Sequence, residues 1–187
     1  MNALQRSALL GLALVGGCGY NTIQTYDEQV NAAQAQIKVQ LQRRADLIPN
    51  LVETVKGYAK QEQTVFTEVA EARARLAGAV QSGDLQQMAA ANAALTAPLG
   101  RLLAIAENYP QLKSNENLRA LQDQLEGTEN RIAVARQDYN DAVNRYNAYI
   151  RRFPQVLTAK VIGKGARPYF ELQRPEAAEA PKVDFTK

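Results

Sequence analysis

The longest regular pattern in the chain lies in residues 118–153, LRALQDQLEGTENRIAVARQDYNDAVNRYNAYIRRF. Apolar or small residues recur here in alternating steps of three and four, which is typical of a long amphipathic or coiled-coil helix. With Ser114 as N-cap and Pro154 as terminator, this helix would have about 39 residues and a length of ~58 Å. The positions on its apolar stripe are Leu118, Leu121, Leu125, Thr128, Ile132, Ala135, Tyr139, Ala142, Tyr146, Tyr149 and Phe153.

A second long helix, with an apolar stripe that matches that of the first, is predicted to begin near Asn21. A four-residue skip in its stripe restarts the pattern at Leu41 and places Arg44 among the apolar positions. Pro49 should kink this helix rather than end it, because the pattern continues beyond the proline. The apolar positions are Ile23, Tyr26, Val30, Ala33, Ile37, Leu41, Ile48, Leu51, Val55 and Tyr58.

Two shorter helices are predicted between the long ones, over residues 62–81 and 85–107. Gly83 provides a left-handed stop for the first, and Asp84 provides an N-cap for the second. Short loops make neighbouring helices antiparallel, so we expect an all-α, elongated antiparallel bundle with two long outer and two shorter inner helices. This domain would span residues 18–171, with a four-helix head, a two-helix stalk at the end where residue 18 lies, and a mobile tail over residues 172–187.

Composition restricts the chemistry that the chain can perform. The chain has no histidine and one cysteine, so a Cys/His zinc site and an intrachain disulfide are excluded, and no metal or cofactor is expected. The net charge of +3 is too small to indicate nucleic-acid binding. An enzyme is the least favoured class, because the commonest general base is missing.

The amino terminus resembles a bacterial lipoprotein signal. A short apolar run over residues 7–15 follows Arg6, and two glycines precede Cys18. We therefore expect residues 1–17 to be removed and Cys18 to be acylated, which anchors the chain in a membrane. An uncleaved transmembrane anchor is the alternative, although a span needs roughly 20 apolar residues; an ordinary buried thiol at Cys18 is a third option. Gly19 after the cysteine slightly favours the outer membrane, and the bundle would face the periplasm.

Two stretches resemble signatures of the LemA family. They are QRRADLIPNLVETVKGYAKQE, residues 42–62, and ENYPQLKSNENLRALQDQLEGTENRIAVARQDYNDAVNRYNAYIRRFP, residues 107–154. The resemblance implies a mostly helical, membrane-anchored protein with a role in envelope processes or, in one branch, magnetosome membrane formation. It implies no catalytic residue. The family tends to carry an aromatic residue after the glycine near position 163, where this chain has Lys164.

A polar cluster is expected where the two long helices pass each other. Arg43, Arg44 and Asp46 lie near Pro49, and Glu129, Arg131 and Arg136 lie midway along the last helix. The cluster Arg44, Asp46, Glu129 and Arg136 is either a network that fixes the register of the helices or a cleft for an anionic or peptide ligand. We expect Glu129 to be the partner of Arg44, because a buried guanidinium requires a carboxylate.

Five cations form a basic run with no acid between them: Arg151, Arg152, Lys160, Lys164 and Arg167. This run either contacts lipid headgroups at the anchored end or simply complements a helix C-terminus. The sequence as a whole predicts a non-catalytic scaffold or adaptor for other envelope proteins. The alternative is a membrane-organising protein that acts directly on lipid through its basic, membrane-proximal end.

Overall fold

The computed structural model describes residues 19–170, and this part of the chain is all-α, as predicted. The expected signal segment, Cys18 and residues 172–187 lie outside the described residues. Six helices are present where four were expected. Their bounds are α2 Tyr20–Lys56, α3 Gln63–Ser82, α4 Leu85–Asn108, α5 Pro110–Lys113, α6 Glu116–Ile150 and α7 Gln155–Val161.

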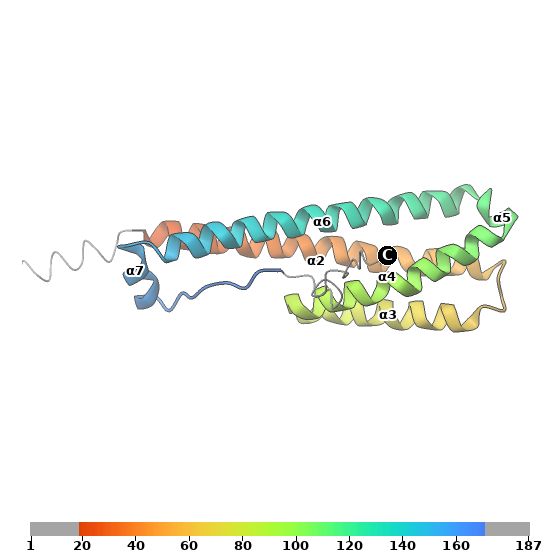
Figure 1. Cartoon of the computed structure of the whole chain (residues 1–187), viewed down its shortest axis with the longest axis horizontal. Helices are drawn as coiled ribbons and strands as arrows, with labels where there is room; N and C mark the ends of the chain where they lie inside the picture. The colour runs from red at the N-terminus through yellow and green to blue at the C-terminus, as the bar shows by residue number, and fades with distance from the viewer. Residues whose placement is uncertain (1–18, 171–187) are drawn as a thin grey trace, which may run out of the picture.

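The two long helices, α2 and α6, lie side by side and antiparallel along the length of the molecule (Figure 1). The heptad positions form the seam between them, and Ile132 and Leu125 of α6 are 1% and 6% exposed. On α2, the buried stripe continues through the expected skip and past Pro49, which lies inside the helix. The predicted seam is confirmed except at two outermost positions, Tyr58 and Phe153, which lie beyond the helix ends and are 49% and 79% exposed. α2 is a single helix of 37 residues.

The shorter helices α3 and α4 form a hairpin that packs on the half of α2 remote from residue 19 (Figure 1). Gly83 has a φ of 73° and ends α3, and the Asp84 carboxylate accepts hydrogen bonds from the backbone N–H groups of Gln86 and Gln87, at 2.8 and 2.9 Å. Both sequence signals for this turn are confirmed. The α3–α4 hairpin and the adjoining part of α2 form the head of the molecule.

Among the helices of residues 19–170, α4 is the one long and apolar enough to cross a membrane by length and composition. The same property is found in core helices of water-exposed bundles. One face of α4 packs in the bundle, and Leu95, Leu99 and Leu102 are buried there. We therefore treat α4 as part of the head.

The last long helix is shorter than predicted at both ends. Its N-cap is Asn115, whose side chain accepts a hydrogen bond from the Leu118 N–H at 3.1 Å, because the Ser114 hydroxyl bonds back to carbonyls of α5. It ends at Ile150, three residues before Phe153. Beyond it, α7 and the extended residues 164–170 lie against the α2–α6 pair (Figure 1), so these segments pack on the part of the pair that was expected to form a two-helix stalk.

Candidate functional site

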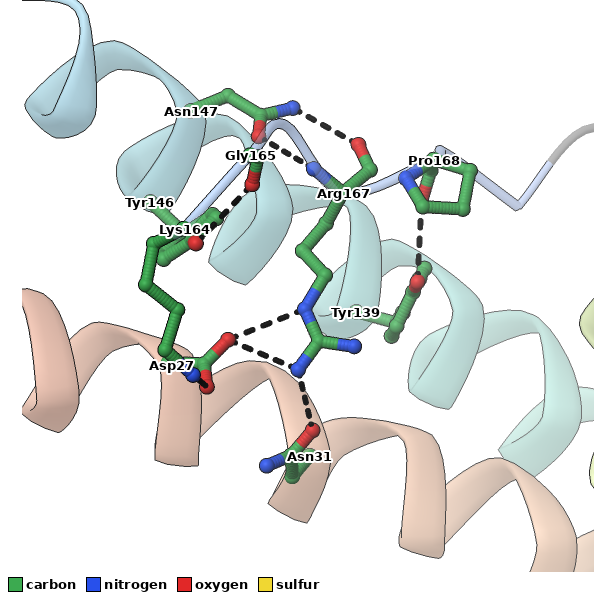
Figure 2. Close-up of polar contacts among 9 residues, drawn as sticks. All are labelled: Asp27, Asn31, Tyr139, Tyr146, Asn147, Lys164, Gly165, Arg167 and Pro168. Atoms are coloured by element: carbon green, nitrogen blue, oxygen red, sulfur yellow. Dashed lines mark hydrogen bonds and ion pairs between the residues drawn. The ribbon is translucent and has the colours of Figure 1, made fainter. Parts of the chain in front are cut away.

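A buried carboxylate on α2, Asp27, binds the segment that follows α7 (Figure 2). Its side chain is 8% exposed and accepts a hydrogen bond from Lys164 Nζ at 2.6 Å. It also accepts two from Arg167, from Nε at 3.0 Å and from Nη2 at 2.8 Å. Arg167 Nη2 donates in addition to Asn31 Oδ1 at 3.0 Å. Asp27 is thus the centre of an ion-paired cluster that joins the first long helix, α2, to the segment after α7.

The environment of Asp27 keeps it ionised. Burial alone would raise the pKa of this carboxyl group, but the hydrogen bonds and charges of Lys164 and Arg167 outweigh burial and hold the pKa below its ordinary value of 3.8. A lowered folded-state pKa means that the interaction stabilises the fold above the unfolded value and is lost as the pH falls through the folded value. The cluster should therefore be fully formed at neutral pH.

The backbone of residues 164–170, which we call the C-terminal strap, is held by side chains of α6. Tyr146 and Tyr139 donate to the carbonyls of Gly165 and Pro168, at 3.0 and 2.9 Å (Figure 2). Asn147 bonds both backbone groups of Arg167, accepting from its N–H at 2.8 Å and donating to its carbonyl at 2.9 Å. Burial raises the pKa of both tyrosines, so their hydroxyls remain protonated donors.

The clamp is repeated one heptad away along α6. Asn140 bonds both backbone groups of Phe170, at 2.8 and 3.2 Å, as Asn147 does those of Arg167. Seven helical residues rise about 10.5 Å, and three extended residues span about 10 Å. Two Tyr-Asn pairs one heptad apart on α6 can therefore bind, in the same way, strap residues that are three positions apart. The spacing of the Tyr-Asn pairs on α6 thus matches an extended chain that runs antiparallel to this helix.

We expect the substitution Asp27→Ala to release the strap. It would leave Lys164 and Arg167, each about one third exposed, to turn into solvent without their carboxylate. The protection of the backbone amides of residues 164–170 against hydrogen exchange should fall at least tenfold at pH 7. The wild type should lose the same protection, relative to the intrinsic exchange rate at each pH, as the pH falls through the lowered folded-state pKa of Asp27. The control is Glu28→Ala, which removes an exposed carboxylate one residue away. Equal protection in the Asp27→Ala variant and the wild type would contradict the anchoring role.

A second buried charge, Arg44, occupies the junction of three helices. Arg44 is 5% exposed, and its Nη1 donates to Glu129 of α6 and, at 2.9 Å, to Asn92 Oδ1 of α4. Burial lowers the pKa of the guanidinium, and the charge of Glu129 opposes that shift. The expected pairing of Arg44 with Glu129 is present. Because the guanidinium is enclosed, the geometry favours a structural network over an open ligand cleft.

The other residues of the expected polar network lie elsewhere. Asp46 is on the exposed face of α2, where it accepts a hydrogen bond from Gln42 at 2.8 Å. Arg136 lies over the ring of Phe170, with its guanidinium carbon 5.0 Å from the ring centroid, and therefore contributes to holding the strap. The expected four-residue network thus divides, since a regular helix turns Asp46 away from the face that carries Arg44.

The basic run also divides. Arg151, Arg152 and Lys160 are exposed at the end of the molecule that holds α7. One of the two interpretations of this run placed Lys164 and Arg167 against lipid together with these three cations, and the structure places the two residues elsewhere. Both bind Asp27, because the strap turns back along the helix pair and carries these two cations to a buried carboxylate.

The sequence analysis missed one partner in each of the two clusters, the one around Arg44 and the one around Arg167. Asn92 and Asp27 were not considered, although Asp27 lies between the apolar stripe positions Ile23 and Val30 and so carried the same signal as Arg44. The strap-binding asparagines carried a signal too, because the dipeptide Tyr-Asn occurs at 139–140 and again one heptad later at 146–147.

Together, these features define an elongated helical protein whose two long helices are joined by a buried ion pair and clasped by the chain's own C-terminal strap. The chain belongs to the LemA family, whose sequence model matches residues 33–185. The earlier resemblance is thereby confirmed.

Three relatives are named as magnetosome proteins. MamQ 1 and MamQ 2 of Paramagnetospirillum magneticum are each 28% identical to this chain over 187 aligned residues, which cover 88% of the chain and 68% of the relative. MamQ of Magnetospirillum gryphiswaldense is 26% identical over 174 residues, or 81% of the chain and 64% of the relative.

Proposed function

We propose that this chain is a non-catalytic, membrane-anchored protein of the bacterial envelope that acts as a helical scaffold or adaptor for other envelope proteins. The observation that carries the proposal is the position of Gly19, the residue that precedes the first helix of the bundle. Gly19 lies against Tyr149 and Gln155 at one end of α2, and a Cβ added to Gly19 would lie 2.9 Å from Cγ of Gln155. An anchor preceding Gly19 would therefore hold the rod by that end.

The length of α2 sets the consequence of such an anchor. A helix of 37 residues is about 55 Å long, so the far end of the head would stand roughly that distance from the anchored end. A head held at a fixed height suits a protein that presents a surface to partners in the periplasm. Membership of the LemA family and the similarity to proteins named as magnetosome proteins support a place at a bacterial membrane.

Acylation of Cys18 is the first test of this proposal. We expect Cys18→Ser to move the protein from the membrane fraction to the soluble fraction, or to leave an unprocessed precursor, because the acyl chains supply the anchor. Fractionation and intact-mass measurement of the wild type and the variant would show it, with Ser7→Ala as the control for a neutral change in the same segment. A wild-type protein that keeps residues 1–17 and carries no acyl mass would overturn lipidation.

Affinity capture is the test of the adaptor role. A chain tagged after residue 187 and recovered from envelope membranes should bring down one or more envelope proteins in stoichiometric amounts. The head should be required for capture, so replacing the exposed face of α4 with charged residues at Ala93 and Ala97 should abolish it. Recovery of lipid alone would favour the second candidate function.

That second candidate is a protein that organises lipid directly. The exposure of Arg151, Arg152 and Lys160 beside the point where the chain joins the bundle favours it. The two functions separate when the chain lacking residues 1–18 is mixed with anionic liposomes. A scaffold needs its anchor to bind them, whereas a lipid-organising protein binds them without it and changes their size or curvature.

A further inference from the structure

Large apolar side chains are exposed at the anchored end of the rod. Phe153 is 79% exposed, Leu157 46% and Val161 87%. These three residues are spaced by four along the segment that contains α7, so Leu157 and Val161 share one face of that helix, and Phe153 lies two residues before its first residue. Water-exposed apolar side chains in a contiguous group indicate a surface that is covered by something else.

The opposite face of α7 fixes this short helix to the bundle. Thr158 and Ala159 are each 3% exposed, and α7 contacts both α2 and α6. The apolar face therefore points away from the rod. Tyr20, the first residue of α2, is 45% exposed and begins the helix at this same end, where Gly19 meets Gln155 of α7.

The charges around this face have one sign. Arg151, Arg152 and Lys160 are exposed beside it, and residues 142–170 contain no Asp or Glu. On the facing part of α2, the oxygens of Asp27 are occupied by Lys164 and Arg167, and the exposed Glu28 follows one residue later. Arg151, Arg152 and Lys160 thus place three exposed cations next to three exposed apolar side chains, a combination that matches the headgroup and acyl layers of an anionic bilayer.

From this juxtaposition we propose that the corner formed by residues 151–161 is a bilayer-contact surface, which we call the α7 corner. Phe153, Leu157 and Val161 enter the outer edge of the hydrocarbon layer, and the three cations bind lipid phosphates. The inference rests on the proposed membrane anchoring and deepens it. A lipid anchor alone leaves a rod free to tilt, whereas a second contact at the same end fixes the direction in which the head points.

The absence of tryptophan from the sequence provides a direct test. In the full-length, membrane-anchored chain, Phe153→Trp places a single tryptophan on the α7 corner. Tyr58→Trp is the matched control, since Tyr58 is 49% exposed and follows the end of α2 remote from Gly19. Both proteins are reconstituted in vesicles that contain phosphatidylglycerol, with and without brominated acyl chains. Val161→Trp serves as a second reporter, should Phe153→Trp alter the fold.

We expect the emission of the α7-corner reporters to shift to shorter wavelength and to be quenched several-fold by the brominated chains. The Tyr58→Trp emission should be quenched by aqueous iodide instead. Adding Arg151→Gln, Arg152→Gln and Lys160→Gln should reduce the bromolipid quenching. The same change at the far-end cations Lys56, Lys60 and Lys113 should leave it unaltered.

Flotation of the vesicles separates failure of the inference from failure of the proposed function. If the chain floats with the vesicles but both α7-corner reporters are quenched only by iodide, the bilayer contact is overturned and anchoring stands. If the chain does not float, both ideas fail. A blue shift that appears without vesicles and grows with protein concentration would show that a second copy of the chain covers the α7 corner. That result would also overturn the inference.

Discussion

Replacing Ile132 by alanine is expected to lower the free energy of unfolding by about 2–5 kcal/mol. The side chain lies in the middle of the α2–α6 seam and is 1% exposed. Truncation removes three methyl or methylene carbons from a site that rigid helices on either side cannot close, so the loss of transfer free energy and a residual cavity add together. Urea denaturation followed by circular dichroism at 222 nm would measure the change.

Val134→Ala is the matched control on the same helix. Val134 is 59% exposed, and its truncation should change the stability by no more than about 0.5 kcal/mol. Leu125→Ala, in the seam at 6% exposure, should behave like Ile132→Ala. Equal stability of the Ile132 and Val134 variants would show that the heptad stripe does not carry the contact between the long helices.

The fold could be predicted because its main contact, between α2 and α6, follows a repeating pattern in the sequence. A stripe with a 3.5-residue period presents the same face in every heptad, so the seam of α6 followed from ten regularly spaced positions between Leu118 and Tyr149 rather than from any one of them. Helix ends are different, since each depends on a single local competition. Ser114 and Asn115 are both good caps, and only the structure shows that Ser114 completes α5 while Asn115 begins α6.

The candidate site was predictable in part for the same reason. A charged residue on an apolar stripe requires a partner, and this argument paired Arg44 with Glu129. It could not place the C-terminal strap, because Asp27 and Arg167 are 140 residues apart and the strap has no periodicity of its own. For the same reason the sequence did not show that Lys164 and Arg167 leave the basic run to bind Asp27, since charge patterning alone does not show where an extended segment turns back.

The Arg44–Glu129 pair gives the other large expected effect. Glu129→Leu should lower the free energy of unfolding by about 1–3 kcal/mol, because it leaves the buried guanidinium of Arg44 bound to the neutral side-chain oxygen of Asn92 with no carboxylate to balance its charge. Glu129 is 52% exposed, so water can reach its side of the pair and the cost stays below that of a fully buried ion pair.

The double variant Arg44→Met, Glu129→Leu decides what the pair is for. Arg44 Nε is buried and has no hydrogen-bond partner among residues 19–170, so within this part of the chain the guanidinium is incompletely satisfied. Replacing both charges by apolar side chains of similar length should therefore restore stability to within about 1 kcal/mol of the wild type, or exceed it. If the pair fixes register, the restored protein should show altered cross-linking between cysteines placed at facing α2 and α6 positions. Restored stability with unchanged cross-linking would mean that the heptad seam sets the register by itself.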